Sequence, residues 1–152
     1  MSKWNYEDEW FEEGNIVETL AQFLCSKKYE VRYIKDKRKR GKDIVAEKKG
    51  KKLVIEVKGY PSDKYVSGKK KGKKKKTNPR LQAIHWFSSV MFQVIKAKNE
   101  DTGISIGIGL PKFERYLDLI DSVDHFRQQY KVDFYLVDDK QQVSILSHTE
   151  QL

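Results

Sequence analysis

Cysteine, histidine and long apolar runs are scarce in this sequence, and each shortage excludes a class of protein. The single cysteine, Cys25, rules out an internal disulfide framework and a metal cluster built from cysteines. The three histidines are scattered and show no zinc-binding spacing. No apolar run approaches the ~18 residues of a membrane span. The first residues also lack the basic and apolar regions of a secretory signal. We therefore expect a cytoplasmic protein.

The apolar content is low, yet it is sufficient for one core. Hydrophobic residues make up 38% of the 152 residues, and they include 3 Trp, 8 Tyr and 7 Phe. This composition is typical of a folded chain and not of a disordered one. A domain usually contains roughly 100–200 residues. We therefore expect a single domain over residues 1–152, with a basic loop at about residues 60–78.

Positive charge is concentrated in one third of the chain. The sequence has 31 Lys and Arg against 22 Asp and Glu, which gives a formal charge of +9. Residues 35–80 alone hold 20 Lys or Arg and 5 Asp or Glu, so this part carries +15 and the remainder −6. Such a segment is typical of a surface that binds a polyanion, and nucleic acid is the first choice. A solvated, solubilising surface is the alternative.

Residue periodicity predicts three helices and six strands. The helices are expected over residues 9–27, 79–100 and 112–130. The strands are expected at residues 29–34, 43–48, 51–59, 104–110, 132–137 and 142–146. This order predicts an α/β fold in which helices pack on a mixed β-sheet.

Apolar residues recur at helical spacing in the first two helices, and these faces are expected to pack inward. In the first helix they are Val17, Leu20, Ala21 and Leu24. In the second helix, which begins at Pro79, they are Leu81, Ile84, Met91 and Ile95. Cys25 is expected to be a small buried residue on the first helix.

The two strands at residues 43–48 and 51–59 are expected to form a hairpin whose register can be counted. A Lys49-Gly50 link supplies the two turn residues. Counting back from this turn places Asp43 directly opposite Glu56, with Cβ atoms ~5 Å apart on one face. Lys58 lies two residues beyond Glu56 and shares that face. Because like charges opposed across strands are destabilising, the two carboxylates are expected to hold a cation.

A divalent cation is the natural partner of this carboxylate pair. Two carboxylates and several waters suit Mg²⁺, which prefers hard oxygen ligands. Such an ion orients an attacking water and offsets charge at a phosphate. The adjacent Lys58 ammonium can stabilise charge that develops on the phosphate or help to activate the water. The alternative is a surface hairpin in which Asp43, Glu56 and Lys58 form a small ion-pair ladder.

The segment Gly41-Lys42-Asp43-Ile44-Val45, followed by Glu56-Val57-Lys58, resembles the core motif of the PD-(D/E)XK nuclease superfamily. The resemblance covers about residues 10–100. Members of this superfamily include archaeal Holliday junction resolvases and Mrr-type nucleases. It implies a restriction-endonuclease-like fold, which is a mixed β-sheet flanked by helices. Lys42 stands where the name of the superfamily has a proline.

The resemblance implies roles for the residues of the hairpin. Asp43 and Glu56 become ligands of Mg²⁺ or Mn²⁺, together with the backbone carbonyl of Val57. Lys58 becomes the catalytic lysine.

The resemblance also implies contributions from the two neighbouring helices. Members of the superfamily often add a glutamate from the first helix as a metal ligand and catalytic group. Glu18 is the best match for this role, ahead of Glu12 and Glu13, and a solvated helix residue is its alternative. A catalytic polar residue from the following helix also recurs, and Gln82 matches it.

The leading interpretation is a metal-dependent endonuclease that hydrolyses phosphodiester bonds in duplex or branched DNA. The alternative is a non-catalytic nucleic-acid-binding module or an accessory subunit on the same fold. The residues expected to contact DNA are Lys69, Lys70, Lys71, Lys73, Lys74, Lys75, Lys76, Arg80 and His85. Tyr60, Tyr65 and Trp86 are candidates for stacking on bases or sugars. Cleavage of both strands by one small domain usually needs two active sites, so we also expect a homodimer. Because the expected substrate is DNA, the nucleoid is the expected location.

Overall fold

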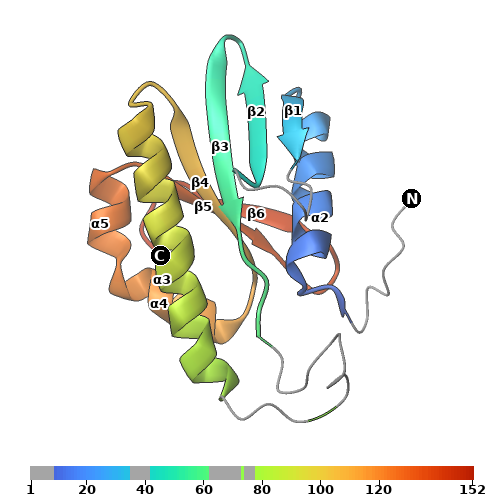
Figure 1. Ribbon diagram of the computed structural model, residues 1–152, viewed down its shortest axis with the longest axis vertical. Helices are drawn as coiled ribbons and strands as arrows, with labels where there is room; N and C mark the ends of the chain where they lie inside the picture. The colour runs from blue at the N-terminus through green and yellow to red at the C-terminus, as the bar shows by residue number, and fades with distance from the viewer. Residues whose placement is uncertain (1–8, 35–41, 62–72, 74–77) are drawn as a thin grey trace.

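The computed structural model describes residues 9–34, 42–61, 73 and 78–152, which form a β-sheet covered by helices on both faces (Figure 1). The helices are α2 (Glu13–Ser26), α3 (Pro79–Glu100), α4 (Glu114–Ser122) and α5 (Asp124–Gln129). The strands are β1 (Glu30–Ile34), β2 (Ile44–Lys48), β3 (Lys51–Val57), β4 (Ser105–Pro111), β5 (Val132–Val137) and β6 (Val143–Leu146). Within the described ranges, no helix combines the length and the apolar character needed to cross a membrane.

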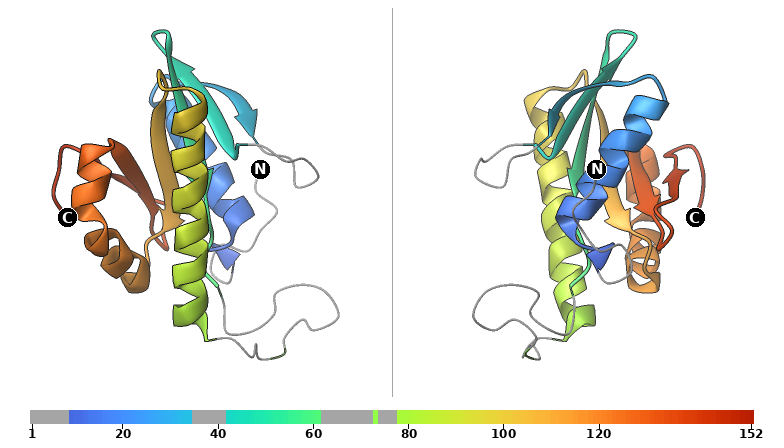
Figure 2. Two further views of the ribbon diagram at one scale, coloured as in Figure 1. Left: turned by 60° about the vertical axis from the view of Figure 1, so that its left-hand side comes forward. Right: turned by 90° about the vertical axis from the view of Figure 1, so that its right-hand side faces the viewer.

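The sheet has a parallel centre and antiparallel edges. Its six strands follow the chain in order from β1 to β6. β3, β4 and β5 pair in parallel, while the other neighbours are antiparallel. Parallel neighbours need crossover connections, which α3 provides between β3 and β4, and α4 with α5 between β4 and β5. These three helices cover one face, and α2 covers the other (Figure 2). The predicted mixed α/β sheet is confirmed, and the arrangement is consistent with a restriction-endonuclease-like architecture.

The β2–β3 hairpin has the register that the sequence predicts. Pairing runs in step from the turn to Ile44 opposite Ile55. The two residues of the Lys49-Gly50 turn have φ angles of 52° and 78°, which is the left-handed backbone that a type I′ turn requires at both positions. One step further along, this register brings Asp43 level with Glu56.

Hydrophobic side chains pack on both faces of the sheet. Between α2 and the sheet, the buried residues include Ile16, Leu20, Leu24, Ile44 and Ile55. Between the other face and α3–α5, they include Val54, Phe87, Val94, Tyr116 and Phe134. Alternate residues of β3 therefore point to opposite faces, as strand geometry requires. Glu56 shares the side of Val54 and faces α3.

Gly109 allows α2 to pack close to the sheet. A Cβ atom at this position would collide with Leu20 Cδ1 on α2. The carbonyl oxygen of Gly109 also accepts a 3.1 Å hydrogen bond from the backbone N–H of Lys58, just beyond β3. The close packing of α2 and the hydrogen bond between Lys58 and Gly109 together fix the position of the chain at the end of β3.

α3 buries a different face from the one that its larger apolar residues predict. The side chains packed on the sheet are Ala83, Phe87, Val90, Val94 and Ala97. Leu81, Ile84 and Ile95 are exposed, and Met91 is half-buried. Ala83 and Ala97, near the two ends of the inner face, leave room for the helix to approach the sheet, while Leu81, Ile84 and Ile95 remain outside. The prediction for this face was therefore wrong.

Two other sequence predictions are corrected. Cys25 is exposed, because it lies one position beyond the buried Leu24 and so points about 100° away from it around the helix. The single helix expected over residues 112–130 consists of α4 and α5, which meet at Val123. Val123 has φ −118° and ψ 16°, a non-helical backbone that separates the two helices.

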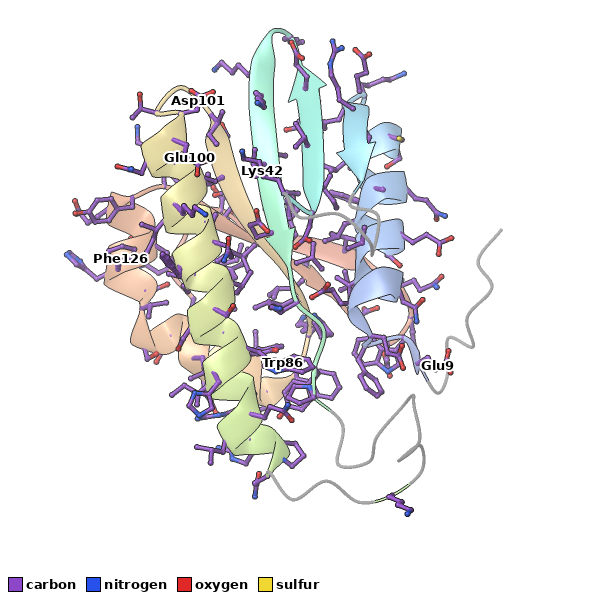
Figure 3. The ribbon with its side chains drawn as sticks, in the orientation of Figure 1. Glu9, Lys42, Trp86, Glu100, Asp101 and Phe126 are labelled. Carbon is purple, nitrogen blue, oxygen red and sulfur yellow. The ribbon has the colours of Figure 1, made fainter. Side chains whose placement is uncertain are left out.

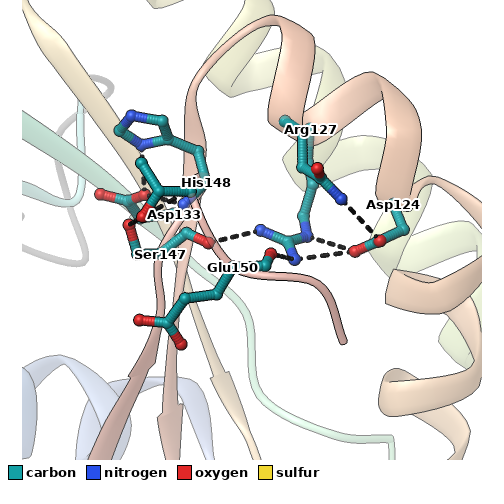
Figure 4. Close-up of polar contacts among 8 residues, drawn as sticks. Asp124, Arg127, Asp133, Ser147, His148 and Glu150 are labelled. Atoms are coloured by element: carbon teal, nitrogen blue, oxygen red, sulfur yellow. Dashed lines mark hydrogen bonds and ion pairs between the residues drawn. The ribbon is translucent and has the colours of Figure 1, made fainter.

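The last residues are attached to the domain through a buried arginine. Arg127 of α5 is 0% exposed. Its guanidinium donates hydrogen bonds to the carbonyl oxygens of Ser147 and Glu150 (Figure 4). The His148 backbone N–H and ring Nδ1 both lie 2.7 Å from Asp133 Oδ1. The segment after β6 is therefore held against α5 and β5.

Candidate functional site

A cleft of about 440 Å³ opens between the ends of β2 and β3 and the adjoining faces of α2 and α3. Figure 3 shows Lys42 and Glu100 at one end of this region, with Trp86 further down α3. The lining residues are Glu13, Lys42, Asp43, Glu56, Val57, Lys58, Ser89, Val90, Gln93, Lys96, Ala97 and Glu100. Charged side chains of both signs thus dominate the lining.

Asp43 and Glu56 are the buried carboxylates of the cleft. Their exposed fractions are 5% and 7%. Asp43 Oδ2 accepts a 2.7 Å hydrogen bond from the backbone N–H of Val57, which holds the side chain against β3. Burial of a carboxylate is costly unless opposite charge or hydrogen bonds compensate. The structure therefore brings together the two acidic residues that the sequence predicts to share a site. Their burial favours the presence of a cation beside them.

Lys58 enters the cleft from the end of β3. Its Nζ lies 3.6 Å from Glu13 Oε1 on α2 and 6.0 Å from the centre of the Trp86 ring on α3. A carboxylate and an aromatic face both attract an ammonium group. Lys58 is therefore held between the two helices, in the same cleft as the buried carboxylates.

The first helix contributes Glu13 to the cleft, whereas the sequence favours Glu18. Among the described residues, Glu13 lines the cleft and Glu18 does not. The reason is a close approach at Gly59, where a Cβ atom would lie 2.7 Å from the backbone nitrogen of Glu13. The start of α2 is thus pressed against the chain directly after Lys58. Gly59 is a sequence signal of a close approach, but the sequence alone does not identify the turn of α2 that makes it.

α3 forms a wall of the cleft with polar residues from its C-terminal half. Ser89, Gln93, Lys96 and Glu100 follow each other at intervals of three or four residues, so they share one helix face. Gln82 lies eleven residues before Gln93, about 16 Å along the helix axis, and it does not line the cleft. Its Oε1 is buried without a hydrogen-bond partner among the described residues. Gln93, and not Gln82, is therefore the glutamine of α3 that lines the cleft.

An ion pair spans one end of the cleft. Lys42 Nζ lies 3.6 Å from Glu100 Oε2 (Figure 3). The two side chains are 32% and 52% exposed, and exposed pairs contribute only about 0–1 kcal/mol. The contact therefore opposes entry of a ligand only weakly.

Aromatic side chains gather where β3 leaves the cleft. The ring of Phe113 stacks with the rings of Trp10 and Tyr60, at centroid distances of 5.2 Å and 4.1 Å. Tyr116 meets Tyr60 edge-on, and its hydroxyl donates a 2.6 Å hydrogen bond to the carbonyl oxygen of Gly59. Burial raises the pKa of both tyrosine hydroxyls. These contacts hold the chain directly after Lys58 against α4.

The residues expected to contact DNA lie partly outside the described residues. Those outside are Lys69, Lys70, Lys71, Lys74, Lys75 and Lys76, together with the stacking candidate Tyr65. Lys73, Arg80 and His85 are described and exposed, and Trp86 is half-buried. Arg80, His85 and Trp86 lie in the first turns of α3, on the side of the molecule where the aromatic side chains gather.

The residues of the cleft fit a hard divalent cation. In the described part of the chain, no three His, Cys, Asp or Glu side chains are grouped as a metal-binding set. Mg²⁺ does not need such a set, since it is commonly held by one or two carboxylates and keeps several waters. Asp43 and Glu56 supply two hard oxygen donors, and Val57 lies beside them in the lining. This donor set suits Mg²⁺ or Mn²⁺ better than a thiophilic metal.

The solved structures that resemble this fold include the following two, although no family model and no curated protein matches the sequence. One is an XisH family protein from Nostoc punctiforme, with 15% identity, a TM-score of 0.52, and coverage of 85% of this chain and 95% of that chain. The other is an fdxN element excision controlling factor protein from Anabaena variabilis, with 17% identity, a TM-score of 0.52, and coverage of 84% and 93%. At these identities the likeness shows a shared fold.

Proposed function

We propose that this protein is a metal-dependent endonuclease of the PD-(D/E)XK superfamily that hydrolyses phosphodiester bonds in DNA. The observation that supports this most directly is the convergence of Asp43, Glu56 and Lys58 on one cleft. Hydrolysis of a phosphodiester requires a site for a cation and positive charge beside the reacting phosphate. The basic segment at residues 35–80 favours a polyanionic substrate.

The carboxylates provide the site for the cation. Asp43, Glu56 and the carbonyl of Val57 would hold Mg²⁺ or Mn²⁺. When bound, such a cation supplies Lewis-acid stabilisation of the phosphate charge and a more acidic water. The hydrogen bond from the Val57 N–H keeps Asp43 in one orientation before any ligand enters. Less ordering is then needed on binding.

Lys58 would act on the scissile phosphate itself. Its ammonium can donate hydrogen bonds to a non-bridging phosphate oxygen while water attacks phosphorus and the bond to the leaving oxygen breaks. Glu13 and Trp86 hold the Lys58 Nζ in place in the absence of DNA. Glu13 is therefore a positioning residue, a role that differs from the metal-ligand role expected of Glu18.

A second copy of the chain is the partner that we propose for cleavage of both strands. Two sites related by a two-fold axis can each cut one strand. Apolar side chains on the outer surface of α3 are available for the contact, and they are Leu81, Ile84, Phe92 and Ile95, with exposed fractions of 56%, 36%, 55% and 46%. Light scattering after size-exclusion chromatography should give a dimer for the native protein and a monomer for Phe92→Glu. A native monomer at all concentrations would contradict this proposal.

Cleavage assays with carboxamide variants test the nuclease proposal. The native protein is incubated with linear duplex and branched DNA in Mg²⁺, Mn²⁺ or EDTA. Asp43→Asn and Glu56→Gln keep the size of each side chain but remove its charge, and each should lower the rate at least ~10²-fold. Asp118→Asn is the matched control, because Asp118 is an exposed carboxylate on α4, and its rate should equal that of the native protein.

Each other outcome has a defined meaning. Cleavage in EDTA, or native rates in Asp43→Asn, would contradict the assignment of the site. Salt-sensitive DNA binding without cleavage in either metal would favour the alternative, a non-catalytic DNA-binding module on the same fold.

A further inference from the structure

Four aromatic side chains lie near Lys58 at one end of the cleft, and of these only Trp86 has a role in the hydrolysis proposed above. Trp10, Tyr60 and Phe113 form a continuous stack, and Trp86 lies against the Lys58 ammonium. All four rings are half-buried, so part of each remains accessible. These four residues are called the aromatic platform below.

The platform is rigidly connected to the cleft. Tyr60 follows Lys58 by two residues, which is about 7 Å of extended chain. The Tyr60 N–H donates a 3.0 Å hydrogen bond to the carbonyl oxygen of Phe11, and the Tyr116 hydroxyl holds the carbonyl of Gly59. Gly59 has no room for a side chain, because a Cβ atom would lie 2.6 Å from the Phe11 oxygen. The spacing between ammonium and platform is therefore set before DNA binds.

Positive charge accompanies the platform. Burial raises the pKa of the Tyr60 hydroxyl, and the charges of Arg80 and Arg115 act on the same group in the opposite direction. Arg115 Nε also donates a 3.4 Å hydrogen bond to the backbone carbonyl oxygen of Arg80, so the Arg115 side chain lies against the first turn of α3. Proteins that bind single-stranded nucleic acid combine cations along the backbone with rings that stack on bases. The surface next to Lys58 has this combination.

We propose that the aromatic platform stacks on unpaired bases next to the scissile phosphate. The preferred substrate is therefore DNA in which a single-stranded segment adjoins the point of cleavage. This inference rests on the proposed nuclease function, which places the scissile phosphate at Lys58. In a continuous duplex each base is covered by its neighbours, so a protein ring can stack on it only after the base leaves the helix. A tail, gap or junction offers free base faces without this cost.

Binding measurements in EDTA separate the inference from catalysis. The native protein is titrated with three labelled DNAs that have equal numbers of phosphates, namely a blunt duplex, a duplex with a single-stranded tail and a dT oligomer, at one salt concentration. The tailed duplex should bind about tenfold more tightly than the blunt duplex, which corresponds to one stacked base. Tryptophan fluorescence should fall on addition of the dT oligomer.

Variants of Trp86 connect the preference to the platform. Trp86→Leu should reduce affinity for the tailed duplex about tenfold more than it reduces affinity for the blunt duplex, because any change at Lys58 affects both DNAs alike. Trp86→Phe retains a ring and should retain most of the preference. Tyr130→Leu is the matched control, because Tyr130 is 62% exposed directly after α5 and does not line the cleft. Thermal melting of each variant verifies that the fold is kept.

The outcomes distinguish failure of this inference from failure of the nuclease proposal. Equal affinity for tailed and blunt duplexes, or a preference that Trp86→Leu does not change, would overturn the inference. The same DNAs are also incubated with Mg²⁺ or Mn²⁺. Preference for tailed DNA without any cleavage would support the platform and reject the nuclease proposal. Equal binding together with equal cleavage of both DNAs would support the nuclease and reject the platform.

Discussion

Lys58 combines a fixed backbone with a side chain held from two sides. Its N–H is bonded to the carbonyl oxygen of Gly109, and its Nζ contacts Glu13 and the face of Trp86. Lys58→Ala should lower the single-turnover rate ~10²-fold or more, because it removes positive charge beside the phosphate. Binding of Mn²⁺, followed by calorimetry without DNA, should remain close to native. Normal turnover in this variant would show that Lys58 is only a surface residue.

Glu13 and Glu18 offer a paired test on one helix. Glu13 contacts Lys58 at 3.6 Å and lines the cleft, whereas Glu18 lies more than one turn further along α2. Glu13→Gln should slow cleavage, because Lys58 loses the carboxylate that positions it. Rescue by Glu13→Asp should be partial, since the shorter side chain retains the charge. Glu18→Gln should stay within about twofold of the native rate. Slower cleavage by Glu18→Gln, together with a native cleavage rate in Glu13→Gln, would show that Glu18 and not Glu13 acts in the site.

At the scale of elements, a hydroxyl on α4 helps to hold the chain that follows β3. The buried Tyr116 hydroxyl donates a hydrogen bond to the carbonyl oxygen of Gly59 at 2.6 Å. Tyr116→Phe leaves that carbonyl without this donor and should destabilise the fold by about 1–3 kcal/mol, measured by urea unfolding. Tyr130→Phe, directly after α5, removes the hydroxyl of an exposed residue and should leave stability unchanged. A Tyr116→Phe variant as stable as the native protein would mean that the bond contributes nothing.

The same tyrosine predicts how stability depends on alkaline pH. Burial, and then the charges of Tyr60 and Glu13, raise the pKa of Tyr116 above its ordinary value of 10.0. Above pH 10 the unfolded chain loses this proton while the folded chain keeps it, so the unfolded state binds fewer protons. The free energy of unfolding therefore decreases as pH rises above 10 and is constant with respect to this group below 10. Urea unfolding at pH 9 and pH 11 should show a smaller decrease for Tyr116→Phe than for the native protein.

The hairpin could be predicted from sequence because its information is local. A two-residue turn fixes the register, and alternation then determines which residues of β3 share a face. The buried face of α3 could not be predicted in this way. Leu81 and Ile95 follow the helical period, but the sheet accepts Ala83 and Ala97 instead, and that choice depends on how close the helix and the sheet come. The distance between helix and sheet cannot be predicted from the hydrophobicity of the helix residues alone.

At the scale of the whole molecule, the candidate site was predictable only where it depended on the hairpin. Asp43, Glu56 and Lys58 are close in sequence through one turn, so counting along the strands was sufficient. The contributions of α2 and α3 depend on how far each helix is displaced along the sheet. The close approach at Gly59 selects Glu13 instead of Glu18, and the length of α3 brings Gln93 to the cleft in place of Gln82.

The final prediction concerns the lysine run at residues 69–76 and the affinity of the protein for DNA. The run at residues 69–76 contains Lys69, Lys70, Lys71, Lys73, Lys74, Lys75 and Lys76. Each lysine that neutralises a phosphate of duplex DNA adds about −0.9 to the slope of log K against log salt. Replacement of Lys70, Lys71, Lys74 and Lys75 with Ser should weaken binding to all sequences alike and flatten the slope by as much as ~3–4 units. Turnover at saturating DNA should be unchanged, because the run supplies no group to the proposed reaction.

A second variant with the same net charge shows whether the position of the lysines matters. Ser replaces Lys27, Lys28, Lys131 and Lys140, which are exposed, lie outside the basic segment at residues 35–80 and do not line the cleft. Both variants lower the formal charge of +9 by four, so a purely global effect of charge would change their affinities equally. Counterion release depends on direct phosphate contacts, so the salt slope should flatten only in the variant at residues 69–76. Equal slopes in both variants would show that the lysine run attracts DNA without contacting it, and loss of turnover at saturation would show that the run helps to build the active site.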